Sequence, residues 1–444
     1  MSLSQLTATE AVRAIRAGEI TSEDLVRDCL QRIAEVDGQV EAWAFLDPDH
    51  ALAQARKADT VTRAGQPRGV LHGVPVGIKD IFDTGDMPTE FGTPLHAGRR
   101  PASDATAVSL LREAGAVIMG KTVTTELAVF SPGKTRNPYN PEHTPGGSSS
   151  GSAAAVAAGM VPLAVGTQTN GSVIRPASYC GVIGFKPTFG AISRRGALSL
   201  SPTLDQVGVF ARTIEDIALI SEALMRFDAG DAAMRSTARP ELIRISAEPP
   251  PVTPRLGFVK TPVWDAAEEA TREAFAELVE TLGDAVEEIA LADPFDQAME
   301  WHRVIMEADL AKNLAAEYGR GADQLSSILR EMIERGQVIL AVDYNRANDW
   351  MPVVRGLLDE AFRWNDALVT PATTGPAPHG LDSTGNPIFC TLWSYLGLPA
   401  VNLPLFRAED GLPFGAQLVA ARGDDARLLR TARWLLERVS IDDE

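Results

Sequence analysis

Two clusters of glycine and serine hold the residue types that a nucleophilic active site needs: residues 146–152 (GGSSSGS) and 167–172 (TQTNGS). An apolar, helix-like run separates them and an Arg-Pro pair follows the second cluster, which does not fit a flexible linker. We interpret the clusters as two tight turns on a buried framework that present hydroxyl and backbone N–H groups to one point. A serine nucleophile with an oxyanion hole requires such an arrangement.

Lys79 is the strongest candidate for the base that such a serine would need. No histidine lies in the G-x-S-x-G context of a nucleophile elbow, and only His143 is close in sequence to the serines. Lys79 ends the apolar run 74–78, where a lysine either extends to solvent or is buried for a function. Burial lowers the pKa of a lysine from about 10.4, so a neutral amine would accept a proton near pH 7.

Phosphate binding is the main alternative for the first glycine cluster. Residues 146–151 lack the Gly-Lys-Ser/Thr ending of a phosphate-binding loop, and no acidic metal-binding residue follows. The second cluster follows a predicted buried strand, and successive N–H groups in such a turn can form an anion-binding nest. The sequence therefore favours acyl chemistry over phosphate chemistry.

The elements that must position these residues alternate between strand and helix, which predicts an α/β fold. Capping patterns at Thr7 and Thr21 predict two N-terminal helices. Strands are expected at 74–78, 116–119 and 162–165, and a helix is expected from about residue 124. Residues 228–254 read as an irregular connection, and residues 290–365 as mostly helical.

Composition and net charge exclude several classes of protein. The chain has 444 residues and a formal charge of −18 without an offsetting basic patch, which argues against a nucleic-acid partner. No apolar run reaches the roughly 18 residues of a transmembrane helix, and the N-terminus carries no signal-peptide pattern. Three scattered cysteines predict buried, reduced thiols, a cytoplasmic location, and neither a disulfide framework nor a metal site.

Taken together, these stretches resemble the amidase signature family. The matching blocks are GGSSSG at 146–151, GS at 171–172, CGVIGFKP at 180–187, GIKD at 77–80, and LGLPAVNLP at 396–404 with GLPFGAQL at 411–418. The resemblance implies one domain over 1–444, with a signature core at about 65–225 and a less-matched, mostly helical region at about 228–365. It also implies a large mixed β-sheet core covered by helices on both faces, and no cofactor.

Carried over residue by residue, the resemblance makes Ser172 the nucleophile, Ser148 a bridging serine after a cis peptide bond, and Lys79 the base. It implies that Lys79 accepts a proton from Ser148, which accepts one from Ser172 as Ser172 attacks an amide carbonyl. The N–H groups of Thr169, Asn170, Gly171 and Ser172 would then form the oxyanion hole.

Four residues are candidates for substrate binding. Asn170 stands where the family commonly has a small residue, so its side chain either reaches substrate or is solvated. Arg175 lies in GSVIRP, which is similar to malonamidase, where the matching arginine engages a substrate carboxylate; a structural ion pair with Asp205 is the alternative we favour. Trp393 and Tyr395 either line the acyl or leaving-group pocket or pack in the core.

The leading hypothesis is a cofactor-free hydrolase of small-molecule amides that works through an acyl-enzyme. The same triad would also hydrolyse carbamates or aryl amides, and the resemblance allows one chain of a glutamine-dependent amidotransferase. The alternative from another class is a non-catalytic scaffold that binds small molecules. We expect a small-molecule partner, with neither nucleic acid nor membrane, and a homodimer as one option for assembly.

Overall fold

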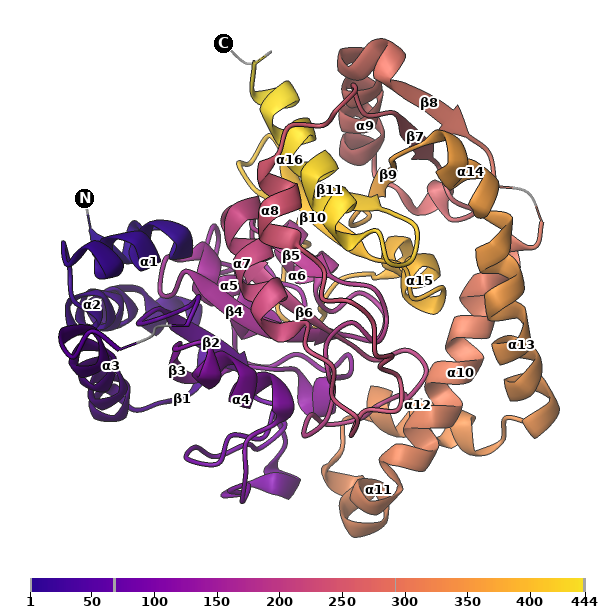
Figure 1. Ribbon diagram of the computed structural model, residues 1–444. Helices are drawn as coiled ribbons and strands as arrows, with labels where there is room; N and C mark the ends of the chain where they lie inside the picture. Colours follow the sequence, from indigo (N-terminus) through magenta and orange to yellow (C-terminus); the bar gives the residue numbers. More distant parts are fainter. Residues whose placement is uncertain (1, 67–68, 292, 442–444) are drawn as a thin grey trace.

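A mixed β-sheet runs through the molecule, as Figure 1 shows for this computed structural model, which describes residues 2–66, 69–291 and 293–441. Within these residues the sheet has eleven strands in the spatial order β1-β3-β2-β4-β6-β5-β10-β11-β9-β7-β8. The strands are β1 (Trp43–Leu46), β2 (Pro75–Lys79), β3 (Val117–Thr122), β4 (Leu163–Gln168), β5 (Ile183–Lys186), β6 (Gln206–Ala211), β7 (Leu256–Val259), β8 (Val286–Ile289), β9 (Ala367–Pro371), β10 (Ala400–Arg407) and β11 (Pro413–Val419).

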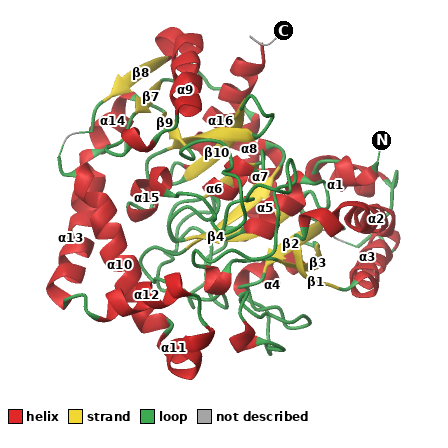
Figure 2. Cartoon of the chain, turned by 180° about the vertical axis from the view of Figure 1, so that it is seen from behind, coloured by secondary structure: helices red, strands yellow, loops and turns green. Residues whose placement is uncertain are grey.

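Helices cover both faces of this sheet, which confirms the predicted fold class (Figure 2). They are α1 (Ala8–Ala17), α2 (Ser22–Val40), α3 (Pro48–Arg63), α4 (Thr106–Glu113), α5 (Ser150–Ala157), α6 (Ile174–Tyr179), α7 (Ile214–Leu224), α8 (Leu242–Ala247), α9 (Glu269–Leu282), α10 (Ala298–Asn313), α11 (Ala315–Gly321), α12 (Ser327–Gln337), α13 (Ala341–Leu357), α14 (Asp359–Trp364), α15 (Ile388–Tyr395) and α16 (Asp425–Ile441).

Local sequence signals fix the first two helices. The hydroxyl oxygen of Thr7 accepts the N–H of Glu10 and that of Thr21 accepts the N–H of Asp24, so each helix starts with the predicted capping interaction. The helix expected from residue 124 is wrong, because the chain makes only a short 3₁₀ turn there. Leu127 has a φ of 45°, which an α-helix does not accommodate.

The strand order brings the two glycine-serine turns to one side of the base. Strand β2 pairs in parallel with β4, with Ile78 opposite Val165, so Lys79 at the end of β2 lies beside the end of β4. The second turn, 169–172, follows β4 directly, and the first turn precedes α5, which packs on β2 and β4. Since neighbouring parallel strands end at the same edge of a sheet, residues distant in sequence meet there.

Candidate active site

Lys79 is completely buried at the end of β2, and its amine lies between two hydroxyl groups. Nζ is 2.7 Å from Oγ of Ser148 and 2.8 Å from Oγ1 of Thr167. Burial lowers the pKa of Lys79 to about 7, although the negative charge of Asp205 acts in the opposite direction. A substantial fraction of Lys79 is therefore neutral near pH 7 and able to accept a proton from Ser148.

Ser148 lies in the first turn, and the peptide bond that joins it to Gly147 is cis, as predicted. The turn is held from two directions. The carbonyl oxygen of Gly147 accepts a hydrogen bond of 2.8 Å from Nη2 of Arg175, and the carbonyl oxygen of Ser148 accepts one of 3.2 Å from the N–H of Thr125. Because Ser148 is only 2 % exposed, its hydroxyl faces protein groups and not bulk water.

Ser172 lies in the second turn, directly before α6, and is half-buried. The side-chain oxygen of Gln168 accepts the N–H groups of Val173 and Ile174 at 2.8 and 3.0 Å, which anchors the start of α6 next to Ser172. Within the described ranges, the Ser172 hydroxyl has no hydrogen-bond partner, so it is available to an incoming carbonyl. Its role as nucleophile and the Ser148–Ser172 proton relay stay predictions.

Four side chains outside the second turn hold its polar groups in place. Oγ1 of Thr169 donates to Asp205 at 2.7 Å, and the carbonyl oxygen of Thr169 accepts from Nε2 of His302 at 3.0 Å. At Asn170, the side-chain oxygen accepts the hydroxyl of Thr391 at 2.8 Å, and the carbonyl oxygen accepts that of Ser394. The turn is therefore fixed by α10, α15 and the segment before β6.

The backbone N–H groups of this turn are left unused. Those of Asn170, Gly171 and Ser172 donate to no group in the part of the chain that the structure describes. Donors fixed in advance by surrounding hydrogen bonds can stabilise a developing oxyanion at little reorganisation cost. The arrangement is suited to bind an anionic oxygen, as the sequence predicts for residues 169–172.

Sequence reasoning missed His302 as a part of the site and expected Asp205 only as an ion-pair partner of Arg175. Burial raises the pKa of Asp205 to about 6, while hydrogen bonds from Thr169, Ser201 and Leu200 lower it. Burial lowers the pKa of His302 to about 4, so the ring is neutral at pH 7 and its Nε2–H donates to the Thr169 carbonyl. Both contact Thr169 from positions remote in sequence, which a local motif does not reveal.

The structure corrects the ion pair expected between Arg175 and Asp205. Asp205 is hydrogen-bonded to Thr169, Leu200 and Ser201 instead. Arg175 is 2 % exposed and donates to the Gly147 carbonyl and to Oγ1 of Thr384, while its Nε and Nη1 have no partner among the described residues. A buried guanidinium with two unused nitrogens therefore abuts the first turn.

Trp393 and Tyr395 are both in the core. Neither is measurably exposed, the Tyr395 hydroxyl donates to the carbonyl of Ala347 at 2.6 Å, and its ring lies 6.2 Å from that of Trp301. This is the packing alternative given for these residues, and neither lines the cavity beside Asn170. A contact between either ring and substrate remains a prediction.

Two cavities adjoin the second turn. The first, of about 360 Å³, begins at Asn170 and Thr391 and extends between α10, α12 and the start of α15. Much of its wall is apolar, and the apolar residues are Phe130, Met299, Met306, Ile328, Met332, Pro387 and Ile388. Its polar lining includes Glu307, which is 2 % exposed and pairs with Arg303 and Arg335 at 2.6 and 2.7 Å.

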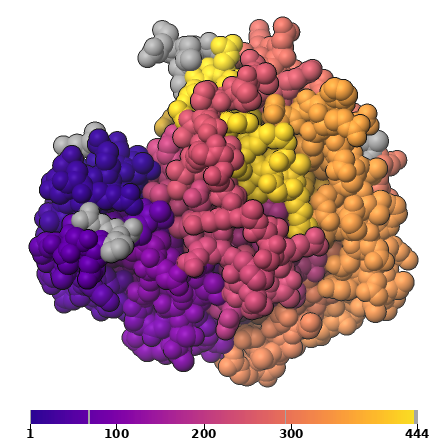
Figure 3. Space-filling view, in the orientation of Figure 1, coloured from indigo at the N-terminus to yellow at the C-terminus, as the bar shows by residue number. Residues whose placement is uncertain are grey.

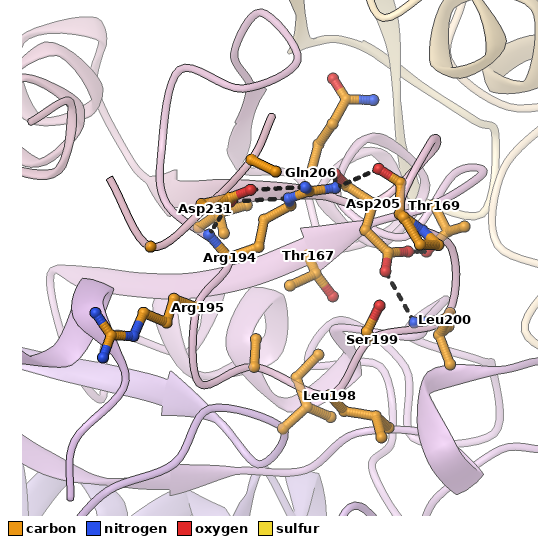
Figure 4. Close-up of a pocket in the computed structure, with 16 residues that line it drawn as sticks. Thr167, Thr169, Arg194, Arg195, Leu198, Ser199, Leu200, Asp205, Gln206 and Asp231 are labelled. Atoms are coloured by element: carbon orange, nitrogen blue, oxygen red, sulfur yellow. Dashed lines mark hydrogen bonds and ion pairs between the residues drawn. The ribbon is translucent and has the colours of Figure 1, made fainter. Parts of the chain in front are cut away.

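The second cavity, of about 180 Å³, lies on another side of the turn and is lined by Thr167, Thr169 and Asp205 (Figure 4). Arg194 forms one of its walls and is held by Asp231 at 2.8 Å. The two threonines connect this cavity to the site, because Thr167 contacts Lys79 and Thr169 belongs to the second turn.

The three cysteines form no disulfide bond with one another. Cys29, Cys180 and Cys390 are free and buried, as predicted. Across residues 2–66, 69–291 and 293–441, no three metal-ligating side chains come together. None of the helices in those ranges is long and apolar enough to cross a membrane.

Comparison with known proteins identifies the family. The amidase family model matches residues 24–429. A glutamyl-tRNA(Gln) amidotransferase subunit from Symbiobacterium thermophilum is 36 % identical over 481 residues, covering 99 % of this chain and 98 % of that protein. A peptide amidase solved with the competitive inhibitor chymostatin is 30 % identical, with a TM-score of 0.87 and 99 % of each chain covered.

A further solved structure comes from a vestigial protein complex described as revealing the evolutionary origins of an s-triazine catabolic enzyme. It is 28 % identical, has a TM-score of 0.91, and covers 97 % of this chain and 98 % of its own. The family match over nearly the whole length, the shared fold and the two turns around Lys79 lead to one conclusion. The chain belongs to the amidase signature family.

Proposed function

We propose that this protein hydrolyses the amide bond of small molecules through an acyl-enzyme formed on Ser172. The observation that carries the proposal is the buried amine of Lys79, which has a pKa of about 7 and lies 2.7 Å from the Ser148 hydroxyl. A buried lysine with a lowered pKa is a candidate catalytic base when its amine lies within hydrogen-bond distance of a serine hydroxyl, as that of Lys79 does.

In the proposed reaction, Ser172 Oγ attacks the carbonyl carbon while its proton passes to Ser148, whose own proton passes to Lys79. The negative oxygen of the tetrahedral intermediate is bound by the N–H groups of the second turn, each contributing about 3 kcal/mol. The protonated Lys79 returns a proton through Ser148 to the leaving nitrogen, and the C–N bond breaks. Water then attacks the acyl-serine by the same relay, releasing the acid and free Ser172.

The cavity beside Asn170 supports small, partly apolar substrates. Three methionines, Met299, Met306 and Met332, line it, and methionine side chains adapt to ligands of irregular shape. A carbamate ester presents a similar carbonyl flanked by nitrogen, so hydrolysis of carbamates or aryl amides by the same groups belongs to this proposal. Asn170 lines this cavity and is a proposed substrate contact, whereas Arg175 is proposed to hold the first turn through the Gly147 carbonyl.

A second candidate function is glutamine hydrolysis as one chain of an amidotransferase. It is favoured by the similarity to the glutamyl-tRNA(Gln) amidotransferase chain of Symbiobacterium thermophilum over almost the full length of both proteins. In that role the protein would need a partner chain, whereas the hydrolase would act alone or as a homodimer. Turnover of simple amides by the purified chain without any added protein therefore separates the two candidates.

The decisive experiment combines labelling with turnover. We expect a serine-directed fluorophosphonate to modify Ser172, as located by peptide mass spectrometry, and the purified chain to release amine from a panel of anilides, aliphatic amides and carbamates. Ser172→Ala should lose both the label and the turnover, whereas Ser236→Ala, at an exposed serine, should keep both. Unchanged turnover in Ser172→Ala would contradict the mechanism, and absence of turnover with an intact label would favour the amidotransferase.

We propose a cytoplasmic location, because free, buried thiols at all three cysteines are typical of a protein in a reducing compartment.

The alternative of a non-catalytic scaffold predicts a different result. A scaffold that only binds small molecules does not need a buried lysine next to a serine. A chain that binds small molecules but catalyses no turnover would favour this alternative.

A further inference from the structure

A third cavity, of about 570 Å³, lies apart from the residues of the active site. Its walls come from the segments after β5 and α7 and from the turn before α16. In Figures 1 and 3 the segment around α8 lies against the yellow C-terminal helix α16. None of Lys79, Ser148 or Ser172 lines it.

Four arginines line this one cavity: Arg226, Arg235, Arg239 and Arg422. Arg226 is paired with Glu113 at 2.5 Å. The other three form no ion pair with any residue that the structure describes. Arg239 donates only to the carbonyl of Glu222, and Arg422 donates only to the carbonyl of Phe189.

All four arginines are exposed to solvent, and the positive charges near Arg422 repel one another. The guanidinium groups of Arg235 and of neighbouring Arg355 lie close enough to help burial lower the pKa of Arg422. Arg235 likewise helps burial lower the pKa of Arg355. In a chain with a net charge of −18, mutually repelling arginines that form no ion pair among the described residues indicate a place where a ligand supplies the negative charge.

Asp425, a carboxylate in the wall, raises the pKa of Arg422 and so offsets part of this positive charge, but it forms no ion pair with an arginine among the described residues. It is buried and accepts the N–H and the hydroxyl of Thr188 at 2.8 and 2.6 Å, so its oxygens are engaged within the protein. The remainder of the wall is largely apolar. Phe189 lies beneath Arg422, with the guanidinium 5.7 Å from the ring centroid, and Phe227 is 54 % exposed beside it.

We propose that this cavity binds a small organic phosphate, with the phosphate oxygens on Arg235, Arg239 and Arg422 and the organic part against Phe189 and Phe227. Arginine presents paired donors that match phosphate oxygens, and aromatic rings accept a planar or apolar group. The volume of about 570 Å³ is within the range of small-molecule sites, so a ligand of nucleotide size is the class expected.

Calorimetry on the full chain at 150 mM salt tests the proposal, with ATP, inorganic pyrophosphate and adenosine as probes. ATP should bind with a dissociation constant below 1 mM and more tightly than pyrophosphate, and adenosine should bind at least tenfold more weakly than ATP. The double variant Arg235→Ala/Arg422→Ala should weaken ATP binding about 100-fold or more, because each lost charged hydrogen bond is worth about tenfold or more.

The matched control is Arg272→Ala/Arg346→Ala, which removes the same charge from two positions outside the cavity and should leave ATP binding within twofold. Thermal unfolding of both variants establishes that each is folded. Equal weakening in the two double variants would identify general charge attraction and overturn the proposal. Absence of ATP and pyrophosphate binding below 1 mM in the unmodified chain would overturn it as well.

Discussion

The amine of Lys79 and the hydroxyl of Ser148 are separated by 69 positions in sequence and by 2.7 Å in space. The contact exists because β2 and β4 are parallel neighbours, and the turn that holds Ser148 precedes the helix packed on them. A second hydroxyl, on Thr167 of β4, lies 2.8 Å from the same amine. The amine of the proposed base therefore contacts two hydroxyl groups and hydrogen-bonds to no carboxylate among the described residues, so burial is the main cause of its lowered pKa.

The activity of the unmodified chain should rise with pH through about 7, because only neutral Lys79 accepts the serine proton. Lys79→Ala should lower kcat/KM by about 10²–10⁴-fold, since this is the range that a general base contributes. It should also remove the rise of kcat/KM with pH. Initial rates on one anilide from pH 5.5 to 9.5 provide the measurement. If kcat/KM of Lys79→Ala still rises at the same pH, Lys79 is excluded as the titrating base.

The same lysine should make stability depend on pH. Its pKa is about 7 in the folded chain and 10.5 for an unperturbed lysine, so between these values the unfolded chain binds the extra proton. The free energy of unfolding of the unmodified chain, relative to Lys79→Met, should therefore rise with pH from about 7 to 10.5. Below pH 7 the difference should stay constant. Urea titrations of both proteins at pH 6, 7, 8 and 9 measure it.

The negative charge of Asp205 should influence the pKa of Lys79 and thereby the pH dependence of the activity. Its negative charge raises the pKa of Lys79, so Asp205→Asn should move the rising limb of the kcat/KM profile to lower pH. Asp205→Glu is the matched control, because it keeps the negative charge but displaces the 2.7 Å hydrogen bond from Thr169. It should lower kcat with the limb in place. Equal shifts in the two variants would mean that the hydrogen bond, and not the charge, sets the pKa.

Arg175 should act mainly through the first turn. Arg175→Met removes the 2.8 Å bond to the Gly147 carbonyl and should lower kcat/KM about 10–100-fold on neutral amides, the worth of a charged hydrogen bond. Substrates with and without a carboxylate, such as malonamate and a neutral amide, should be affected alike. A loss confined to the KM of the carboxylate substrate would instead assign Arg175 to substrate binding.

Asn170 and Thr391 should behave as one unit. Asn170→Ala and Thr391→Val each remove the 2.8 Å hydrogen bond between them, and each should lower kcat/KM about 2–10-fold by loosening the second turn. The double variant should be no worse than either single one, as expected for a shared interaction. A much larger effect of Asn170→Ala alone would show that its side chain contacts the substrate.

Sequence reasoning recovers the features that local chemistry dictates. A capping residue such as Thr7, a lysine at the end of an apolar strand and a glycine-serine turn each have a physical signature within a few positions. Asp205 and His302 have none, because their importance comes from contact with Thr169 across the fold. The ion pair expected for Arg175 failed for the same reason: an arginine and an aspartate far apart in sequence carry no information on which way each faces.

Between β8 and β9 the chain forms the helices α10 to α14, and the first of these joins the cavity wall to the second turn. Met299 and Met306 of α10 line the adjoining cavity, and His302 of the same helix donates to the Thr169 carbonyl. A substitution that moves α10 to reshape the cavity would therefore also move a support of the proposed oxyanion hole. Redesign for new substrates is better directed at Met332 of α12, which lines the cavity on a helix with no hydrogen bond to the second turn among the described residues.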